Sequence, residues 1–307
     1  MNNELTYHLT IGSLRILAHL PLWLLYRASD CMYVITRYLI RYRRQAVAGN
    51  LARAFPELGK PERLRTERKF YLHLCDCIVE TIKLLHISDK EIDRRVQVEG
   101  GDMVERLAAD GCPVVLFLGH YGNWEWVQAV TRHYARPATS GQVYKPLHDA
   151  VMERVMLKIR SRFNTISIPQ KRTVRTLLRM TREGRQWLIG FIADQRPNSG
   201  NPHHWTTFLG QDTAYVTGGE EIGRHTKAHF LYLDVEKTRR GHYRMTFHAI
   251  DPIQDGEPWP YTRGFMHMLE QTIRREPAYW LWSHKRWKGG RPDASQTIQT
   301  TPNDKNI

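Results

Sequence analysis

Two short segments near the middle of the chain, 114–118 (VVLFL) and 187–193 (WLIGFIA), are apolar at every position. Runs of this kind are typical of strands that are buried on both faces of a parallel sheet. Segments with apolar residues at helical spacing alternate with them, as at 149–163. The same criteria predict helices at 61–86, 102–109, 124–134, 172–183, 215–226 and 261–275, and strands at 166–168, 228–235 and 243–250. Helices that alternate with apolar strands predict an α/β fold, with a mixed, mostly parallel sheet flanked by helices.

The N-terminal part of the chain is apolar in a different way. Apolar and aromatic residues dominate 14–40, but no uncharged run reaches the roughly 18–20 residues that a spanning helix needs. Basic residues then follow at Arg41, Arg43, Arg44 and Arg53. This pattern favours a helix anchored in or on a membrane, with the body of the protein beside anionic headgroups. An amphipathic helical hairpin packed on the domain is the alternative.

The chain divides into three predicted parts. Residues 1–45 form the N-terminal membrane-associated helical segment, and 46–290 form one domain that carries the chemistry. Residues 291–307 are polar and almost free of apolar side chains, so we expect a disordered tail.

The charge and the cysteines restrict the partners and the compartment. Lys and Arg number 45 against 31 Asp and Glu, a formal net charge of +14, which favours an anionic membrane surface, an acidic protein or nucleic acid. Cys75 and Cys77 are too close for a C-x-x-C motif, and four cysteines in so long a chain are no disulfide framework. Buried free thiols in a reducing compartment are the simpler interpretation, which places the catalytic part in the cytoplasm.

Polar residues follow both fully apolar strands directly. The first strand is followed by Gly-His-Tyr-Gly-Asn-Trp-Glu (119–125), and the second by Asp-Gln-Arg-Pro (194–197). In open α/β sheets, reactive groups gather just beyond the carboxyl ends of the strands. These two clusters are therefore the candidates for chemistry.

A histidine followed five residues later by an acid is common by chance. The composition gives about 1.5 such pairs in a chain of this length, and four occur. Only His120 and Glu125 follow an apolar strand directly and enclose a Gly-Asn turn. Asn123 is a natural N-cap, which would put Glu125 in the first turn of a helix, where the helix dipole favours a carboxylate.

The pair of His120 and Glu125 suits general-base catalysis. A carboxylate that holds one imidazole nitrogen fixes the tautomer and stabilises the imidazolium once the other nitrogen has taken a proton. No Ser or Cys stands beside His120 to act as a covalent nucleophile. We therefore expect the hydroxyl of an acceptor to be the nucleophile. A structural histidine at a strand end is the alternative interpretation.

Six motifs occur in order along the chain: HYGNWE, VYKPLHD, RSRFNTISIPQK, FIADQRP, HHWTTFLGQDTAYVTGG and YWLWSHKRWK. Together they resemble the late acyltransferases of lipid A biosynthesis (the lauroyl and myristoyl transferases), in the lysophospholipid acyltransferase-like superfamily. The resemblance implies a glycerolipid acyltransferase-like fold and a fatty acyl thioester donor, commonly acyl carrier protein. It also implies a hydroxyl of a lipid A precursor as acceptor, no metal or other cofactor, and a place at the cytoplasmic face of the inner membrane.

The resemblance also implies roles for individual residues. His120 and Glu125 match the catalytic pair of the family. Arg162 matches a basic position that suits a phosphate of the donor or the acceptor. Asp194 and Gln195 match a block that lies near the active site.

Other residues are predicted to contact the substrate. Asn123 belongs to the first motif, and Lys145 stands where Arg is usual in the family. Asn164 stands where Gly is frequent. The segment 280–288 combines three tryptophans with basic residues, among them His284 and Arg286. It suits lipid phosphates at a membrane interface, whereas no nucleic-acid motif accompanies it. An exposed edge strand is the alternative.

The sequence thus predicts O-acyl transfer to a lipid hydroxyl. One alternative keeps this chemistry and changes the acceptor to a lysophospholipid, an amino-acyl lipid or a phosphatidylinositol glycoside. A second is a thioesterase, in which water replaces the acceptor. A third is a non-catalytic basic protein that binds a membrane or nucleic acid.

Overall fold

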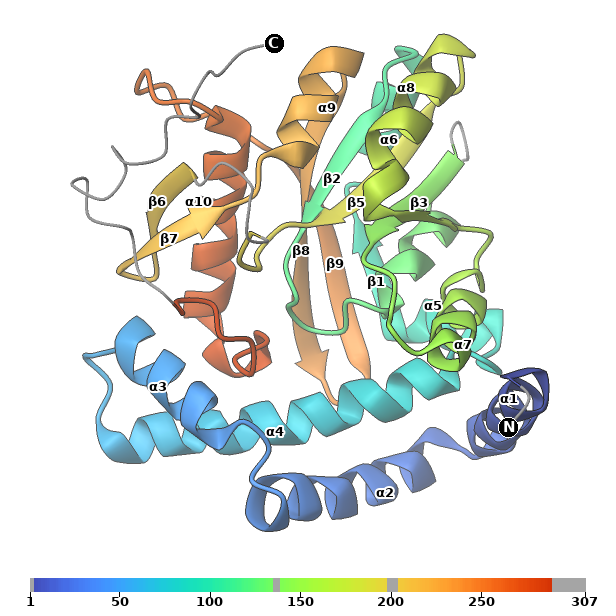
Figure 1. Cartoon of the computed structure of the whole chain (residues 1–307), viewed down its shortest axis with the longest axis vertical. Helices are drawn as coiled ribbons and strands as arrows, with labels where there is room; N and C mark the ends of the chain where they lie inside the picture. Colours follow the sequence, from blue (N-terminus) through green and yellow to red (C-terminus); the bar gives the residue numbers. More distant parts are fainter. Residues whose placement is uncertain (1–2, 135–138, 198–203, 289–307) are drawn as a thin grey trace, which may run out of the picture.

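A seven-stranded sheet forms the centre of the molecule (Figure 1), in the strand order β1-β9-β8-β2-β5-β3-β4. The computed structural model describes residues 3–134, 139–197 and 204–288. Strands β8, β2, β5, β3 and β4 run parallel, whereas β9 pairs antiparallel with β8, and β1 pairs parallel with β9. The strands are β1 (Val96–Glu99), β2 (Val114–Leu118), β3 (Thr139–Tyr144), β4 (Ile166–Pro169), β5 (Trp187–Ile192), β8 (His229–Arg239) and β9 (His242–Ala249). The predicted mixed, mostly parallel sheet is confirmed.

Helices flank this sheet. In the described residues the α-helices are α1 (Asn3–His19), α2 (Leu22–Val34), α3 (Arg44–Ala54), α4 (Lys60–Lys83), α5 (Asp89–Arg95), α6 (Gly101–Ala109), α7 (Ala150–Arg160), α8 (Thr173–Arg182), α9 (Gly218–Thr226) and α10 (Pro260–Arg275). Helices α9 and α10 pack against the central strands β2 and β8, and α5 and α6 contact β9. The long helix α4 crosses below the ends of β8 and β9, with α2 and α3 beside it (Figure 1).

The two strands that the apolar runs predicted lie side by side at the centre. Every residue of β2 is buried, as are all but the last of β5. Since alternate side chains of a strand point to opposite faces, this burial shows that both faces are covered. On one face the ring of Phe117 stacks against Phe265 of α10, with 5.1 Å between the ring centroids.

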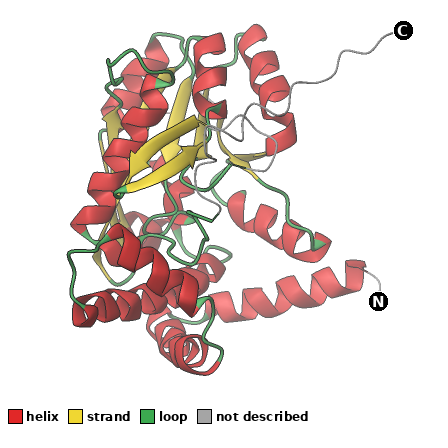
Figure 2. Cartoon of the chain, turned by 60° about the vertical axis from the view of Figure 1, so that its left-hand side comes forward, coloured by secondary structure: helices red, strands yellow, loops and turns green. Residues whose placement is uncertain are grey.

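The sequence analysis missed β1, β3 and two strands outside the main sheet. Only the first residue of β1 is buried and every residue of β3 is only partly buried, so neither shows an apolar run. A separate antiparallel ribbon, β6 (His204–Phe208) and β7 (Gln211–Tyr215), lies in front of the main sheet in Figure 2. The helix predicted at 215–226 begins only at Gly218, because β7 extends to Tyr215. The segment predicted as helical at 124–134 is a 3₁₀ helix, η2 (Trp126–Arg132).

The N-terminal helices pack on the body of the protein and also expose apolar side chains. Helix α1 lies against α7, where Glu4 and Arg154 form an ion pair at 2.6 Å, and α2 lies against α4. Among the described residues no single helix has the length and apolarity to cross a membrane. Asn3–His19 and Leu22–Leu39 reach that threshold only as a pair, which is bent by 115°. The predicted tail, 291–307, lies outside the described residues.

A buried carboxylate on α4 joins the N-terminal helices to the sheet. Asp76 is 1% exposed and accepts hydrogen bonds from Ser29 of α2 at 2.8 Å and from Arg240 at 2.6 Å. Lys237, near the end of β8, forms an ion pair with the same carboxylate at 3.4 Å. Breaking a buried ion pair leaves an uncompensated buried charge, which is costly.

Replacing Asp76 with Ala should therefore lower the free energy of unfolding by about 3–5 kcal/mol, because Lys237 and Arg240 lose their shared acceptor. Denaturant unfolding in detergent, followed by circular dichroism, measures the change. The matched control is Asp102→Ala. Asp102 forms an ion pair with Arg106 that is exposed and screened by solvent, so its loss should lower the stability far less. Equal losses for the two variants would show that the Asp76 cluster does not tie α2 to the sheet.

Candidate active site

His120 and Asp194 meet at the carboxyl ends of β2 and β5. These strands are parallel, and their register pairs Leu118 with Ile192. His120 and Asp194 each stand two residues beyond that pair, so they lie level with one another. The Nδ1 atom of His120 lies 2.7 Å from Oδ1 of Asp194, although 74 residues separate them in the chain.

Asp194 is buried and has three N–H donors around it. Besides His120 Nδ1, its carboxylate accepts hydrogen bonds from the backbone N–H of His120 at 2.9 Å and from the indole Nε1 of Trp280 at 2.7 Å. Burial opposes ionisation of this carboxyl, but His120 and the hydrogen bonds outweigh it, so the pKa of Asp194 lies below its ordinary value. Asp194 is therefore an anion at neutral pH.

The charge of Asp194 determines the tautomer of His120. A carboxylate can only accept, so Nδ1 carries the proton and Nε2 keeps its lone pair. The side chain of His120 is 18% exposed, and the amide of Gln195 lies 3.3 Å from Nε2. The arrangement leaves one partly accessible basic nitrogen, held in a fixed orientation, at the edge of the sheet.

Glu125 does not form the expected contact with His120. Its carboxylate instead accepts two hydrogen bonds from Arg160, at 2.6 and 2.9 Å. Arg160 is the last residue of α7, and its pKa is raised, because the charge of Glu125 outweighs the effect of burial. The carboxylate partner of His120 is thus Asp194, which the sequence analysis had placed near the site without a role. Arg160 was missed because its partner lies 35 residues away in sequence.

Asn123 organises the loop that follows His120. Its side-chain oxygen accepts from the backbone N–H groups of Glu125 and Trp126, both at 3.1 Å, as a capping residue does. The helix η2 begins at Trp126, however, so Glu125 occupies its N-cap position and not its first turn. The amide nitrogen of Asn123 donates to Glu80 at 2.7 Å, and the residue is 1% exposed. Asn123 is consequently a structural residue of the turn, and the expectation that it contacts substrate does not fit its burial.

Helix α4 supports the same loop from below. Glu80 accepts from Asn123, and its backbone oxygen accepts from the indole of Trp126 at 2.9 Å. Two turns back along α4, the imidazole of His73 lies 3.1 Å from the carbonyl oxygen of Gly122. Gly122 has φ of 58°, and a Cβ there would lie 2.6 Å from Val235, so only glycine fits.

Other predicted site residues lie apart from His120. Arg162 donates to the carbonyl of Ile87 at 3.1 Å and to Asp89 at 2.8 Å. Lys145 is exposed just after β3. Neither forms a contact with His120 within the described parts of the chain. Asn164 has φ of 57°, in the left-handed region that Asn tolerates better than most residues.

The C-terminal segment closes one side of the site. Tyr121 and Trp280 form a β-bridge, and the backbone N–H of Leu281 donates to the carbonyl of His120 at 3.1 Å. His284 accepts from the backbone N–H of Arg196 at 3.4 Å. Trp280, which holds Asp194, was noted in the sequence only as one of three tryptophans. Its role depends on a contact with a residue 86 positions earlier.

Comparison with known proteins adds to this geometry. Residues 1–289 match the family described as "Bacterial lipid A biosynthesis acyltransferase". The chain is 23% identical over 282 residues to the "Lipid A biosynthesis palmitoleoyltransferase" of Escherichia coli (strain K12), covering 91% of this chain and 89% of that protein. It has the same identity and coverage with the "Lipid A biosynthesis acyltransferase" of Shigella flexneri.

The buried His73 predicts a pH dependence of stability. Lys237 lies 3.1 Å from Nδ1 and can only donate, so His73 is neutral, with its proton on Nε2. Burial, followed by the charge of Lys237, lowers its pKa well below the ordinary value of 6.5 for histidine. Stability from this group is complete above the unfolded pKa and is lost as pH falls below about 6.5, where the unfolded chain takes up the proton.

Between pH 7.5 and 5.5, His73 should therefore cost the wild type about 1 kcal/mol of unfolding free energy. The variant His73→Gln should show a smaller loss over this range, because glutamine does not titrate. Denaturant unfolding at a series of pH values gives the difference, in which the other histidines cancel. Parallel curves for the two proteins would contradict a neutral, buried His73.

Proposed function

Since the chain belongs to the bacterial lipid A biosynthesis acyltransferase family, we propose that it transfers a fatty acyl chain from acyl carrier protein to a hydroxyl of a lipid A precursor. It is an acyltransferase, and its acceptor is a lipid. The observation that carries the proposed mechanism is the 2.7 Å contact between His120 and Asp194. The two relatives, both lipid A acyltransferases by name, support the acceptor.

In the proposed reaction His120 is the general base. Its Nε2 takes the proton of the acceptor hydroxyl, and the resulting alkoxide attacks the thioester carbonyl. The tetrahedral intermediate then collapses, the C–S bond breaks, and the thiolate of the donor takes the proton back from Nε2. Asp194 keeps Nδ1 protonated throughout and stabilises the imidazolium that forms between the two steps.

Glu125 is proposed to act by holding Arg160 in place. The bidentate pair fixes the guanidinium of Arg160 beside the loop that follows His120. The N–H groups of Arg160 that do not bind Glu125 are proposed to stabilise the oxyanion of the transition state. Glu125 is thus proposed as a positioning residue rather than as the partner of the base.

The exposed apolar surface supports a place on a membrane. Large hydrophobic side chains that are exposed are concentrated between Leu5 and Tyr42, with Ile16, Trp23 and Leu39 each at least 65% exposed. Arg41 and Arg43 follow directly and suit anionic headgroups. We place the enzyme at the cytoplasmic face of the inner membrane, with 1–45 as the membrane-associated segment and 46–290 as the catalytic domain.

Replacing His120 with Ala should lower the turnover number by about 10²–10⁴-fold, because no other group takes the proton of the hydroxyl. Asp194→Asn should cause a loss of similar order, since an amide facing Nδ1 favours the wrong tautomer. The measurement is transfer from labelled acyl carrier protein to a purified lipid A precursor. His225→Ala, on the exposed side of α9, is the control and should keep full activity.

Three outcomes would count against the proposal. Full transfer by His120→Ala, with folding verified, would show that His120 is not the general base. Wild-type turnover on lysophospholipids alone, with none on the lipid A precursor, would move the acceptor to another lipid class. Release of free fatty acid without an acylated lipid would identify a thioesterase.

A further inference from the structure

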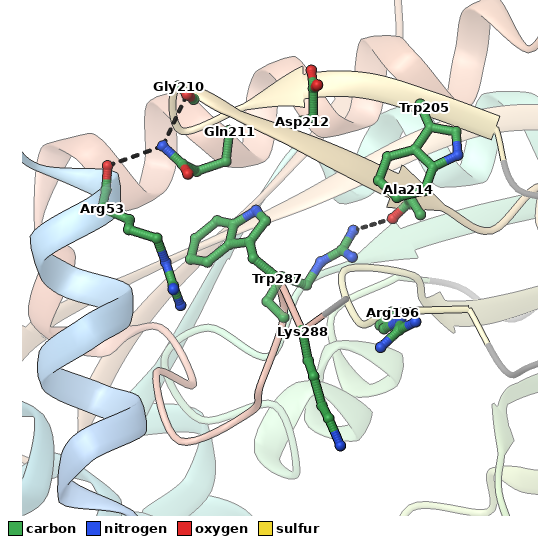
Figure 3. A pocket seen from close by; sticks show the side chains of 10 residues that line it. Arg53, Arg196, Trp205, Gly210, Gln211, Asp212, Ala214, Trp287 and Lys288 are labelled. Carbon is green, nitrogen blue, oxygen red and sulfur yellow. Dashed lines mark hydrogen bonds between the residues drawn. The ribbon is translucent and has the colours of Figure 1, made fainter. Parts of the chain in front are cut away.

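A cationic cavity opens beside the active site, between the end of α3, the ribbon β6–β7 and the last described residues of the chain (Figure 3). It has a volume of about 500 Å³. Four cations and one carboxylate belong to its wall: Arg53, Arg196, Arg286, Lys288 and Asp212. In Figure 3 the carboxylate of Asp212 points away from Arg196 and Lys288. The cavity therefore favours an anion.

Arg286 is the most informative residue of this wall. It is only 2% exposed, and one of its nitrogens donates to the carbonyl of Ala214 at 2.6 Å. Its Nε and Nη1 atoms are buried and have no hydrogen-bond partner among the described residues. Burial lowers the pKa of this guanidinium to about 10, which leaves it charged at neutral pH.

Unsatisfied donors on a buried charge are costly, at about 1–3 kcal/mol or more for each group. Native proteins satisfy nearly all such groups. Two nitrogens without an acceptor on one arginine therefore suggest that a ligand supplies the acceptor. A guanidinium N–H group forms a strong, charge-assisted hydrogen bond with a phosphate oxygen. The exposed side chains of Arg196 and Lys288 would meet the remaining oxygens.

One stretch of chain joins this cavity to the catalytic histidine. Asp194 and Gln195 contact His120, while the next residue, Arg196, lines the cavity. Consecutive Cα atoms lie 3.8 Å apart, so the residue that contacts His120 and the residue that lines the cavity are direct neighbours. The backbone N–H of Arg196 also contacts His284, on the segment that carries Arg286.

We propose that this cavity binds a phosphate group of the lipid acceptor while the hydroxyl of the same lipid molecule that is acylated lies at His120. The inference rests on the proposed function and goes beyond it, because it assigns the residues that determine which hydroxyl of the acceptor is acylated. An acceptor with a phosphate would be held in one orientation, and the position of that phosphate determines which hydroxyl reaches Nε2.

The test compares a phosphorylated lipid A precursor with the same lipid after removal of its phosphate. Arg196→Gln, Lys288→Gln and the double variant change exposed side chains, so they should fold even if Arg286→Gln does not. We expect each single variant to raise KM for the phosphorylated acceptor about tenfold. The KM for the dephosphorylated acceptor and for acyl carrier protein should stay within about twofold of the wild-type values.

The control is Arg179→Gln, which removes the same charge from an exposed position on α8. It should leave all three KM values unchanged. If the variants raise KM for acyl carrier protein instead, the cavity serves a phosphate of the donor and the assignment is wrong. Equal KM values in the variants and the wild type would also overturn it.

Equilibrium binding separates this inference from the proposed function. The phosphorylated lipid, in detergent micelles and without a donor, is titrated into the wild type and the double variant. Weaker binding by the double variant supports the cavity even if no transfer is detected, and equal affinity overturns it. Absence of transfer by the wild type would count against the acyltransferase proposal alone.

Discussion

The buried carboxylate of Asp194 is the interaction on which the candidate site depends. An anion in this position is tolerated only because three N–H groups surround it, two from His120 and one from Trp280. The three residues come from the ends of two strands and from the C-terminal segment. One charge thus fixes the tautomer of the histidine, the position of its backbone and the closure of one side of the site.

Polar residues of α4 give the site a second layer of support. Glu80 and His73 bind the loop of Asn123 and Gly122, and Asp76 binds the N-terminal helix α2 and Arg240. Three of these contacts are buried and the one with Arg240 is partly buried, so they are costly to lose. A helix that crosses the carboxyl ends of the strands therefore links α2 to the geometry of the candidate site.

The cations that give the chain its large positive charge have different structural roles. Arg160 is neutralised by Glu125, and Arg240 by Asp76 and Asp30, so these cations hold the fold and the site together. The cations around Arg286 meet only one carboxylate in their cavity wall. The net charge of +14 could not distinguish these roles, because a sum carries no information on which cations have partners.

The sequence by itself determined the α/β alternation, the buried strands β2 and β5, and the reactive histidine just beyond the first of them. Such features follow from local periodicity, since a strand buried on both faces must be apolar throughout. The acyltransferase family was likewise readable from ordered motifs. Only the tertiary structure decided that His120 meets Asp194 rather than Glu125, and that Arg286 is buried with donors that no described residue accepts. The register of parallel strands 74 residues apart sets the first contact, and packing of the C-terminal segment against β7 sets the second. Neither contact produces a periodic pattern of residues in the sequence.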